Sequence, residues 1–300
     1  MSTSQSAARF GALALAIGII GISFSPIFVK LSEVGPTATA FYRMAFALPA
    51  LAIWVMLESR GPVARRPVAR RDWWLLALCG LLFTADLICW HAAIRMTSVA
   101  NATFLGNLGT LVVSLGAWLI LRERVTWGFA LGMALSLGGV TMLMSASASV
   151  ATGGLEGDGM GILTALFYGG YLFVVKLARD RGLATGLIMG VSGAISTIGF
   201  IIVALALGET IIPETLFGWG MLIGIALITQ AGGQSLVTVA MRHLPATLVS
   251  VSLLMNPVLS AVFAWAMLDE RLTLLQGAGC AVVFAGILIA QRLNRPARTT

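Results

Sequence analysis

Ten apolar stretches run through the chain, and each is about as long as a helix that crosses the hydrocarbon core of a bilayer. They span residues 10–29, 37–57, 73–94, 98–120, 126–145, 159–177, 184–207, 217–239, 246–268 and 273–291. Such a crossing takes about 20 predominantly apolar residues, and a helix satisfies every backbone polar group within its own segment. The sequence therefore predicts an all-α, polytopic membrane protein with ten transmembrane helices. The connections are short and leave no room for a soluble domain.

The composition excludes the soluble classes of protein. Only 10% of the residues are charged and 58% are hydrophobic, whereas a soluble domain carries about 25% charged residues. Soluble enzymes, nucleic-acid-binding proteins and disordered chains are therefore excluded. The net charge of +7 does not indicate a nucleic-acid partner, because basic residues at the ends of spans set membrane topology. We expect the lipid bilayer as the partner and a functional monomer.

Residues with metal-binding or catalytic chemistry are few and scattered. Cys79, Cys89 and Cys280 all fall within apolar stretches, which is typical of small packing residues and not of a disulfide framework. No His/Cys cluster has the spacing of a metal site, so we expect neither a metal nor a cofactor. No paired carboxylates or nucleophile–base set stands at a suitable spacing. We therefore do not expect an enzyme.

The distribution of Lys and Arg predicts the orientation. With the N-terminus inside, 15 of the 19 basic residues lie on the inner side, 3 lie on the outer side, and Arg43 lies within a span. Cytoplasmic loops are enriched in Lys and Arg. We expect a multi-pass protein of a bacterial-type plasma (inner) membrane with both termini in the cytoplasm. The first span is predicted to stay as a helix, because no small-residue cleavage signal follows it.

The chain repeats itself at an offset of 147 residues. Residues 117–124 read AWLILRER, residues 264–271 read AWAMLDER, and 9 of the 23 positions from 117 to 139 match. We predict two five-helix halves, residues 1–147 and 148–300. Because five is odd, equivalent loops lie on opposite faces, so the halves are inverted repeats around a central cavity, an arrangement of many secondary transporters. The alternative is a duplicated structural bundle that transports nothing.

These features resemble a known family. The tandem halves, the Leu-x-Glu-Arg ending of the fourth span, the Tyr42-Arg43 pair and the repeated Trp-x-x-Leu-x-Glu-Arg before a Gly-rich span are similar to EamA-type members of the drug/metabolite transporter superfamily. Within it the chain looks most like the YddG-type amino-acid exporters. The resemblance implies ten helices, cytoplasmic termini, alternating access and export of small metabolites.

Polar side chains inside spans are candidate site residues, because they are costly in hydrocarbon. Asp86 is the only acidic residue that we place within a span, and Trp90 shares its helix face at i+4. Asp86 would hold a substrate ammonium or a proton; the alternative is a buried hydrogen-bond anchor between helices. His91 is a second candidate, since its side chain can titrate near neutral pH, although it could simply line the helix end.

The fourth span carries one polar stripe. Thr103, Asn107, Thr110 and Ser114 stand at i, i+4, i+7 and i+11, and Asn101 lies off the stripe near the outer end. Such a stripe either lines a water-filled path or joins helices. We predict that the four-residue stripe lines a water-filled path, because four aligned polar groups exceed what joining helices needs, and Asn101, Thr103 and Asn107 are candidate cavity residues.

The second half offers three further polar faces, on the sixth, eighth and ninth spans. Their candidate cavity residues are Tyr168, Tyr171, Gln230, Gln234, Ser252 and Asn256. Glutamine amides can bind both a carboxylate and an amine, and aromatic rings suit an apolar or aromatic amino acid or an organic cation. Trp127, at a span end, is instead expected to be an interfacial anchor.

Three other features are predicted to be structural or mechanical. Arg43 is expected to snorkel outward, or to pair with a helix-end carbonyl or an acid, and the pair Glu123-Arg124 is expected to stabilise a turn or gate one face. Pro26 and Pro257 remove backbone hydrogen bonds within spans and are predicted hinges.

The predicted function is a secondary transporter that exports small metabolites, amino acids first, by alternating access. The alternative is a multidrug or organic-cation efflux transporter, for which Asp86 would be essential. Proton antiport and passive facilitation both remain open.

Overall fold

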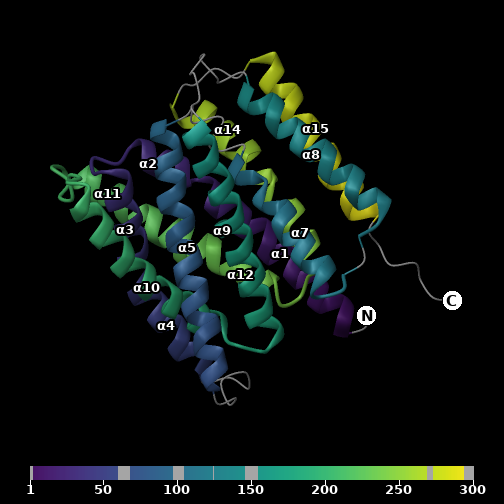
Figure 1. The fold of residues 1–300 in the computed structure, drawn as a ribbon, viewed down its shortest axis with the longest axis horizontal. Coiled ribbons are helices and arrows are strands. Elements are labelled where there is room, and N and C mark those ends of the chain that lie inside the picture. Colours follow the sequence, from purple (N-terminus) through teal and green to yellow (C-terminus); the bar gives the residue numbers. More distant parts are fainter. Residues whose placement is uncertain are drawn as a thin grey trace.

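The computed structural model describes residues 3–59, 68–96, 105–123, 125–145, 155–268 and 273–293, and the regular elements among them are helices (Figure 1). They are α1 (Thr3–Ser23), α2 (Ser25–Lys30), α3 (Pro36–Ala45), α4 (Ala47–Ser59), α5 (Arg70–Met96), α7 (Gly109–Leu119), α8 (Trp127–Ser145), α9 (Leu155–Asp180), α10 (Thr185–Ala206), α11 (Leu216–Gly224), η2 (Ile225–Gln234), α12 (Ser235–Ala240), α13 (Ala246–Leu253), α14 (Met255–Leu268) and α15 (Leu274–Leu293).

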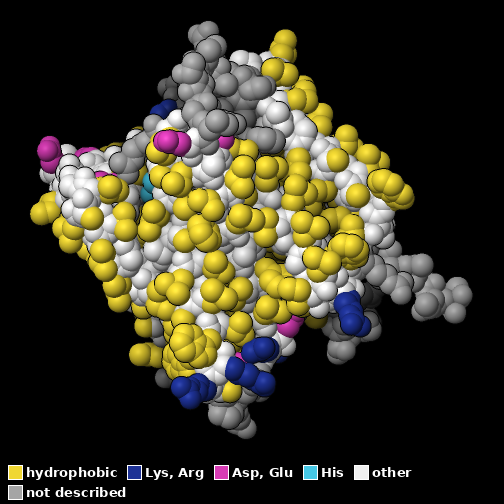
Figure 2. Space-filling view, in the orientation of Figure 1, with side chains coloured by type: hydrophobic (Ala, Val, Ile, Leu, Met, Phe, Trp, Pro, Cys, Tyr) yellow, Lys and Arg dark blue, Asp and Glu magenta, His cyan; other side chains and the backbone are white. Residues whose placement is uncertain are grey.

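Most of the predicted spans are present as long apolar helices. Within the described residues, eight helical stretches are long and apolar enough to cross a membrane, and two shorter ones, Leu105–Leu119 and Trp127–Met142, occupy the fourth and fifth predicted positions. Large apolar side chains such as Ile53, Leu205 and Trp265 are exposed on the outside of the bundle. Figure 2 shows hydrophobic side chains as a broad yellow surface between the charged ends of the visible face. The polytopic all-α prediction is confirmed.

One end of the bundle carries most of the described Lys and Arg residues, and we call it the basic face. Contacts join its loops: Arg181 pairs with Asp72 at 3.5 Å, and the Phe10 ring meets His243 edge-on. At the C-terminal end, Thr126 donates a hydrogen bond to the carbonyl oxygen of Leu293. Figure 2 shows dark blue side chains gathered at this lower end. The N-terminal end of α1 and the C-terminal end of α15 both lie on the right side of the view in Figure 1.

Prolines coincide with breaks in three spans. The first span breaks at Phe24, two residues before Pro26, and the ninth at Leu254, three residues before Pro257. The second span breaks at Phe46 before Pro49. Because proline has no N–H, it cannot donate to the residue four positions back, and the helix kinks there. The breaks that the hinge prediction needs are present, whereas the hinge motion itself stays a prediction.

Helix contacts follow the symmetry of the repeat. The second and seventh spans pack together as α3 and α4 against α10, and the fourth and ninth as α7 against α13. The third span packs on the sixth as α5 against α9, and the eighth on the first as η2 and α12 against α1. These last two pairs exchange when first-half spans are replaced by their second-half equivalents. The boundary between residues 147 and 148 lies outside the described residues, so the exact division into halves stays a prediction.

The closest crossing joins α8 to α15. A Cβ added at Gly132 would lie 2.5 Å from the carbonyl oxygen of Gly286, and one added at Gly139 would lie 2.7 Å from that of Gly279. The contact partners run in opposite directions along the chain, so the two helices are antiparallel. Small residues let backbones approach this closely in membranes. Because α8 and α15 are repeat equivalents, their antiparallel packing inverts one half relative to the other.

Two glutamates fasten the second span to the seventh at both ends. Glu58, at the end of α4, accepts hydrogen bonds from the backbone N–H groups of Thr185 (3.2 Å) and Gly186 (2.6 Å), at the start of α10. Glu209, just after α10, accepts one from the N–H of Ala38 at 2.9 Å, at the start of α3. A carboxylate at a helix N-terminus satisfies donors that the helix leaves unpaired. The two contacts are reciprocal, and they hold this helix pair together at both faces.

Candidate functional site

Four spans bring polar side chains together near the middle of the bundle. We call this group the polar cluster, and its members come from α3, α5, α9 and η2. They are Arg43, Asp86, Tyr168, Tyr171, Gln230 and Gln234. Their interactions, given below, connect all four helices. Five of these six residues are sequence-predicted site residues, and Arg43 is the addition.

Arg43 is the cation of the cluster. Its Nε donates a hydrogen bond to Oε1 of Gln230 at 3.0 Å, and one terminal nitrogen donates to Oγ of Ser25 at 3.4 Å. The guanidinium also lies 5.7 Å from the centroid of the Phe83 ring, within the range of a cation–π contact. Of the expected alternatives, outward snorkelling is not what the structure has: the Arg43 side chain binds groups of η2, α2 and α5 inside the bundle, and it interacts electrostatically with an acid, Asp86.

Asp86 is the anion of the cluster. Its side chain is buried, with 5% of the residue exposed, and it interacts electrostatically with Arg43 and Tyr168. Within the described part of the chain, no hydrogen bond or close ion pair occupies its carboxylate. A buried carboxylate without such a partner is costly. Among the described residues its interactions are therefore electrostatic, and its role in binding a ligand stays a prediction.

Aromatic rings and one amide line the cluster beside these charges. Nε2 of Gln234 donates a hydrogen bond to Oη of Tyr171 at 3.3 Å. The Tyr171 ring lies 4.8 Å from that of Phe83 and 6.5 Å from that of Tyr168, centroid to centroid. The cluster thus combines opposite charges, amide groups and ring faces within one region.

Both glutamines lie on an unusual backbone. Residues 225–234, η2, form a π-helix within the eighth span. Such segments are rare and are frequent at functional sites. The N-terminal neighbour α1 packs closely on it, since a Cβ added at Gly233 would lie 2.7 Å from the backbone nitrogen of Ile22. The wider turn therefore presents Gln230 and Gln234 to the cluster while the glycine side of η2 meets α1.

Trp90, His91 and Asn107 lie toward the end of the bundle opposite the basic face. The Trp90 and His91 rings are 5.2 Å apart, and His91 is buried. A Cβ added at Gly106 would lie 3.1 Å from Cγ2 of Thr164 and 4.0 Å from Cδ1 of Trp90. Asn107, the next residue, is half-buried. The structure thus brings the start of the described fourth span beside Trp90.

The rest of the fourth-span stripe serves helix packing. Oγ of Ser114 lies 3.2 Å from Oγ of Ser250 on α13, and Oγ1 of Thr110 contacts Sδ of Met133 on α8 at 3.7 Å. These two residues therefore join helices, which is the alternative reading of the stripe. Asn101 and Thr103 lie outside the described residues, and their predicted place on a path stays a prediction.

Ser252 and Asn256 form hydrogen bonds with different neighbours, and neither neighbour belongs to the polar cluster. Oγ of Ser252 accepts a hydrogen bond from Nε2 of Gln291 on α15 at 3.1 Å. Oδ1 of Asn256 accepts one from Ser260 at 3.3 Å, and Ser260 also donates to the carbonyl oxygen of Ser23 at 2.9 Å. Sequence reasoning placed both on one face of a continuous helix, but the break at Leu254 separates them.

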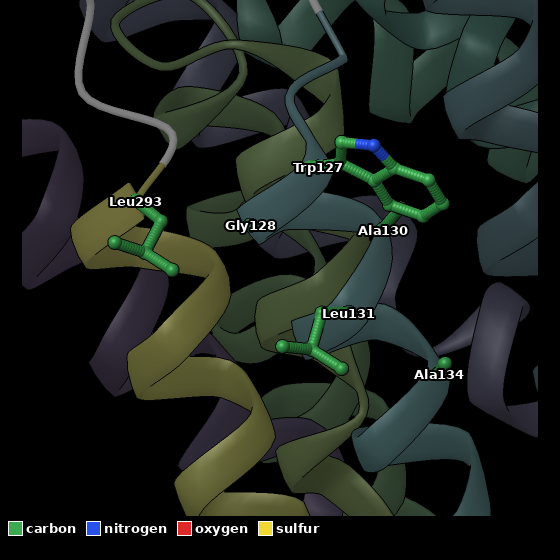
Figure 3. A pocket seen from close by; sticks show the side chains of 6 residues that line it. All are labelled: Trp127, Gly128, Ala130, Leu131, Ala134 and Leu293. Carbon is green, nitrogen blue, oxygen red and sulfur yellow. The ribbon is translucent and has the colours of Figure 1, made fainter.

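An apolar groove lies elsewhere, on the outer surface between α8 and α15. It is lined by Trp127, Gly128, Ala130, Leu131, Ala134 and Leu293 (Figure 3). The Trp127 side chain is 89% exposed, and Figure 3 shows it turned away from Leu293. None of the predicted site residues is in its lining. Its character fits the predicted interfacial role of Trp127 and contact with lipid chains.

The described residues offer no group of three or more His, Cys, Asp or Glu side chains that could hold a metal ion. The polar cluster has the chemical groups to bind a small polar or charged molecule. A guanidinium can hold a carboxylate, a carboxylate can hold an ammonium, and amides can bind either. Tyrosine and phenylalanine rings can pack against an apolar body.

Comparison with known proteins decides the family. The model of the EamA-like transporter family matches the chain twice, at residues 9–145 and 155–291. The chain belongs to the EamA-like transporter family. Each match covers five of the predicted spans.

Relatives of this EamA-like chain are transporters. The pseudopaline exporter CntI of Pseudomonas aeruginosa (strain UCBPP-PA14) is 24% identical over 282 residues, which cover 92% of this chain and 95% of that protein. An uncharacterized transporter of Methanothermobacter thermautotrophicus is 25% identical over 228 residues. That match covers 74% of this chain and 65% of the relative, so the chain spans less than two thirds of its length.

A solved structure shares the fold of the EamA-like chain. This crystal structure superposes with a TM-score of 0.80 at 16% identity, over 98% of this chain and 99% of its own chain. The family and the names of its relatives identify a multi-pass membrane transporter. The finer assignment to YddG-type amino-acid exporters goes beyond these matches.

Proposed function

We propose that the protein exports amino acids with apolar or aromatic side chains by alternating access, as a YddG-type exporter. It would work as a monomer in a bacterial-type inner membrane, with the basic face and both termini in the cytoplasm. The Lys and Arg bias supports this orientation. A related protein is named an exporter, which supports the direction of transport.

A single observation supports the substrate class: a half-buried cation and a buried anion interact electrostatically within the same aromatic cluster. Arg43 is held by Gln230 at 3.0 Å, while Asp86 interacts with it electrostatically and has no hydrogen bond among the described residues. A zwitterionic amino acid matches this arrangement, since its carboxylate would bind Arg43 and its ammonium would bind Asp86. Tyr168, Tyr171 and Phe83 would pack against its side chain.

Arg43 also weighs against an organic cation as the main substrate. A cationic drug would be attracted by Asp86 and the rings but repelled by the neighbouring guanidinium. At ~4 Å two like charges repel by about 4 kcal/mol at an effective dielectric constant of 20. An amino acid instead satisfies both charges. The multidrug alternative therefore becomes an outcome of the test below.

Counterflow into liposomes that contain only this protein tests the proposal. Liposomes are loaded with unlabelled phenylalanine, and entry of three labelled compounds is compared: phenylalanine, phenethylamine without the carboxylate, and 3-phenylpropionate without the ammonium. We expect phenylalanine to exceed both by about tenfold or more, since a lost charge-assisted hydrogen bond costs about 1.5–3 kcal/mol.

Two variants test which side chain binds the carboxylate of the substrate and which binds its ammonium group. Arg43→Gln should remove the preference for phenylalanine over phenethylamine, and Asp86→Asn should remove the preference over 3-phenylpropionate. Thr141→Ala is the matched control, because Thr141 is exposed and hydrogen-bonds to the carbonyl oxygen of Leu137 on its own helix. Transport of phenethylamine or tetraphenylphosphonium as fast as phenylalanine would reject the amino-acid assignment and favour cation efflux.

The same liposomes distinguish the two modes of energy coupling. A pH gradient is imposed across the membrane while phenylalanine is present at equal concentration on both sides. Net accumulation that follows the gradient indicates proton antiport, and flux that is indifferent to it indicates facilitated diffusion.

A further inference from the structure

Glu123 joins the end of the fourth span to the start of the ninth at the basic face. Its Oε1 accepts a hydrogen bond from the N–H of Ala246 at 2.9 Å. Its Oε2 accepts from the N–H and the Oγ1 of Thr247, at 3.1 and 2.8 Å. The carboxylate therefore satisfies free donors at the N-terminus of α13, where negative charge is also favoured by the helix dipole.

The backbone that presents Glu123 is strained. Arg122 has a φ of +55°, and it is the one non-glycine residue with positive φ in the described part of the chain. This conformation brings Cβ close to the following carbonyl oxygen. Such residues persist where the surroundings fix them, and they concentrate at functional sites. Here the N–H of Glu123 bonds back to the carbonyl oxygen of Ala117 at 3.0 Å, which turns the side chain across to α13.

The Glu123 contact lies over a deeper contact between the same two helices. Ser114 and Ser250 are both buried, and their hydroxyl oxygens lie 3.2 Å apart. Toward the polar cluster, Gly109 at the start of α7 packs on α9, since a Cβ added there would lie 3.3 Å from Cδ1 of Tyr168. The fourth span thus runs from the polar cluster to the basic face. At that end, Glu123 joins it to the start of the ninth span.

The second and seventh spans are joined at both ends. Glu58 and Glu209 fasten this pair at both faces, so separation at either end would break a carboxylate contact while the other end stays joined. Glu123 is the described carboxylate that joins α7 to α13 at the basic face, and α7 is the helix that begins beside Tyr168 of the polar cluster.

We propose that Glu123 is the latch that holds the transport path closed at the basic face, and that release of Ala246 and Thr247 opens it. This inference rests on the proposed transport function for its purpose, but its geometry does not depend on the substrate. Glu123 is a positioning residue in this proposal, since it acts through α13 and does not touch the polar cluster.

The test measures how often the basic face opens. Ser250→Cys is introduced into a chain whose Cys79, Cys89 and Cys280 are replaced by alanine, and a membrane-impermeant maleimide is added on the side where protease removes a C-terminal tag. The buried position 250 reacts only when α7 and α13 separate. Glu123→Gln keeps the size of the side chain but loses the charge and one acceptor. We expect labelling to become about tenfold faster, the effect of losing one charge-assisted hydrogen bond.

Glu58→Gln is the matched control, because Glu58 also accepts hydrogen bonds from two N–H groups at a helix N-terminus. It should leave labelling at position 250 unchanged. Size-exclusion profiles and melting temperatures check that both variants fold, and Glu123→Asp, which shortens the reach by one methylene, is the second variant should Glu123→Gln fail to fold.

Labelling within about threefold of the parent in the Glu123 variant, or an equal increase in both variants, overturns the latch, since loss of one charge-assisted bond predicts more. Labelling requires no substrate. If phenylalanine counterflow is absent from every variant while labelling changes as expected, the proposed substrate fails and the latch stands.

Discussion

Ser136 donates a hydrogen bond to the carbonyl oxygen of Val283 at 3.3 Å, and the two residues stand 147 positions apart. That separation is the offset at which the sequence repeats, so each residue contacts its own repeat equivalent. In an arrangement with two-fold symmetry, this happens at the axis. The axis therefore passes between α8 and α15. Because these helices are antiparallel, the axis is perpendicular to them and lies in the membrane plane, as inverted repeats require.

The glycines beside this axis should be intolerant of substitution. Gly132→Ala would place a Cβ 2.5 Å from the carbonyl oxygen of Gly286, so α8 and α15 must separate. We expect a loss of about 1–3 kcal/mol, as in other overpacked interfaces. Thermal unfolding of the purified protein in detergent measures it.

Gly138→Ala is the matched control on the same helix, because an added Cβ there meets nothing within 4 Å. It should leave stability unchanged or raise it slightly, since alanine favours a helix over glycine by about 1 kcal/mol. Equal melting temperatures for the two variants would contradict the close crossing.

The internal repeat could be predicted from the sequence because the matching residues stand close together in two short segments. The Ala-Trp-x-x-Leu-x-Glu-Arg segments keep their register through Gly132 and Gly139, and these glycines mark the crossing itself. The residues of the polar cluster could be predicted from the sequence only in part. Asp86 is conspicuous as an acidic residue in an apolar stretch, whereas Arg43 looked like a helix-end residue because its partner Gln230 lies 187 positions away.

Irregularities within helices account for the other differences between the predicted and the observed positions of side chains. Helical spacing assigned Ser252 and Asn256 to one face, but the chain kinks at Leu254, and each side chain finds its own neighbour. The π-helix around Gln230 likewise packs closely on α1, a distant part of the chain. No pattern of 3.6-residue periodicity contains that information.

The opposite charges of the cluster should stabilise each other. Removing Asp86 leaves the Arg43 guanidinium in the bundle without its neighbouring anion, and removing Arg43 leaves a buried carboxylate uncompensated. We expect both Asp86→Asn and Arg43→Gln to lower the free energy of unfolding. The double variant should recover part of the loss, with a coupling of about 1–3 kcal/mol between the two sites.

A double-mutant cycle on melting in detergent gives this coupling. Thr84 and Ser196, which hydrogen-bond to each other at 3.0 Å on α5 and α10, provide a neutral comparison through Thr84→Ala and Ser196→Ala. Strict additivity for the Arg43 and Asp86 variants would show that the charges act independently.

Acid should lower the stability of the folded protein through His243, in the loop between the eighth and ninth spans. Burial, followed by the nearby charges of Arg242 and Arg179, lowers the pKa of His243 below its ordinary value of 6.5. The folded chain therefore stays neutral at this position in a range where the unfolded chain takes up a proton. Stability is lost as the pH falls from about 6.5 toward the lower folded pKa.

His243→Phe should remove this part of the pH dependence and keep a ring against Phe10, which now meets His243 at 5.6 Å between centroids. Melting temperatures are compared between pH 7.5 and 5.5, so that groups common to both proteins cancel. Parallel curves for parent and variant would refute the assignment to His243.

Gln234 should be required for transport but not for assembly in the membrane. Gln234→Leu removes the hydrogen bond to Tyr171 and replaces an amide that can bind a carboxylate or an amine with an apolar group. A site that hydrogen-bonds its substrate loses about 1.5–3 kcal/mol when a charged partner is left unpaired. We expect phenylalanine counterflow to fall by about tenfold or more at unchanged expression. In Tyr171→Phe, which keeps the ring, counterflow should fall less.

Gln291→Leu is the control, because Gln291 also hydrogen-bonds to a hydroxyl group. That group belongs to Ser252, and the bond joins α15 to α13 away from the cluster. Normal counterflow in Gln234→Leu, or an equal loss in both glutamine variants, would remove Gln234 from the transport path.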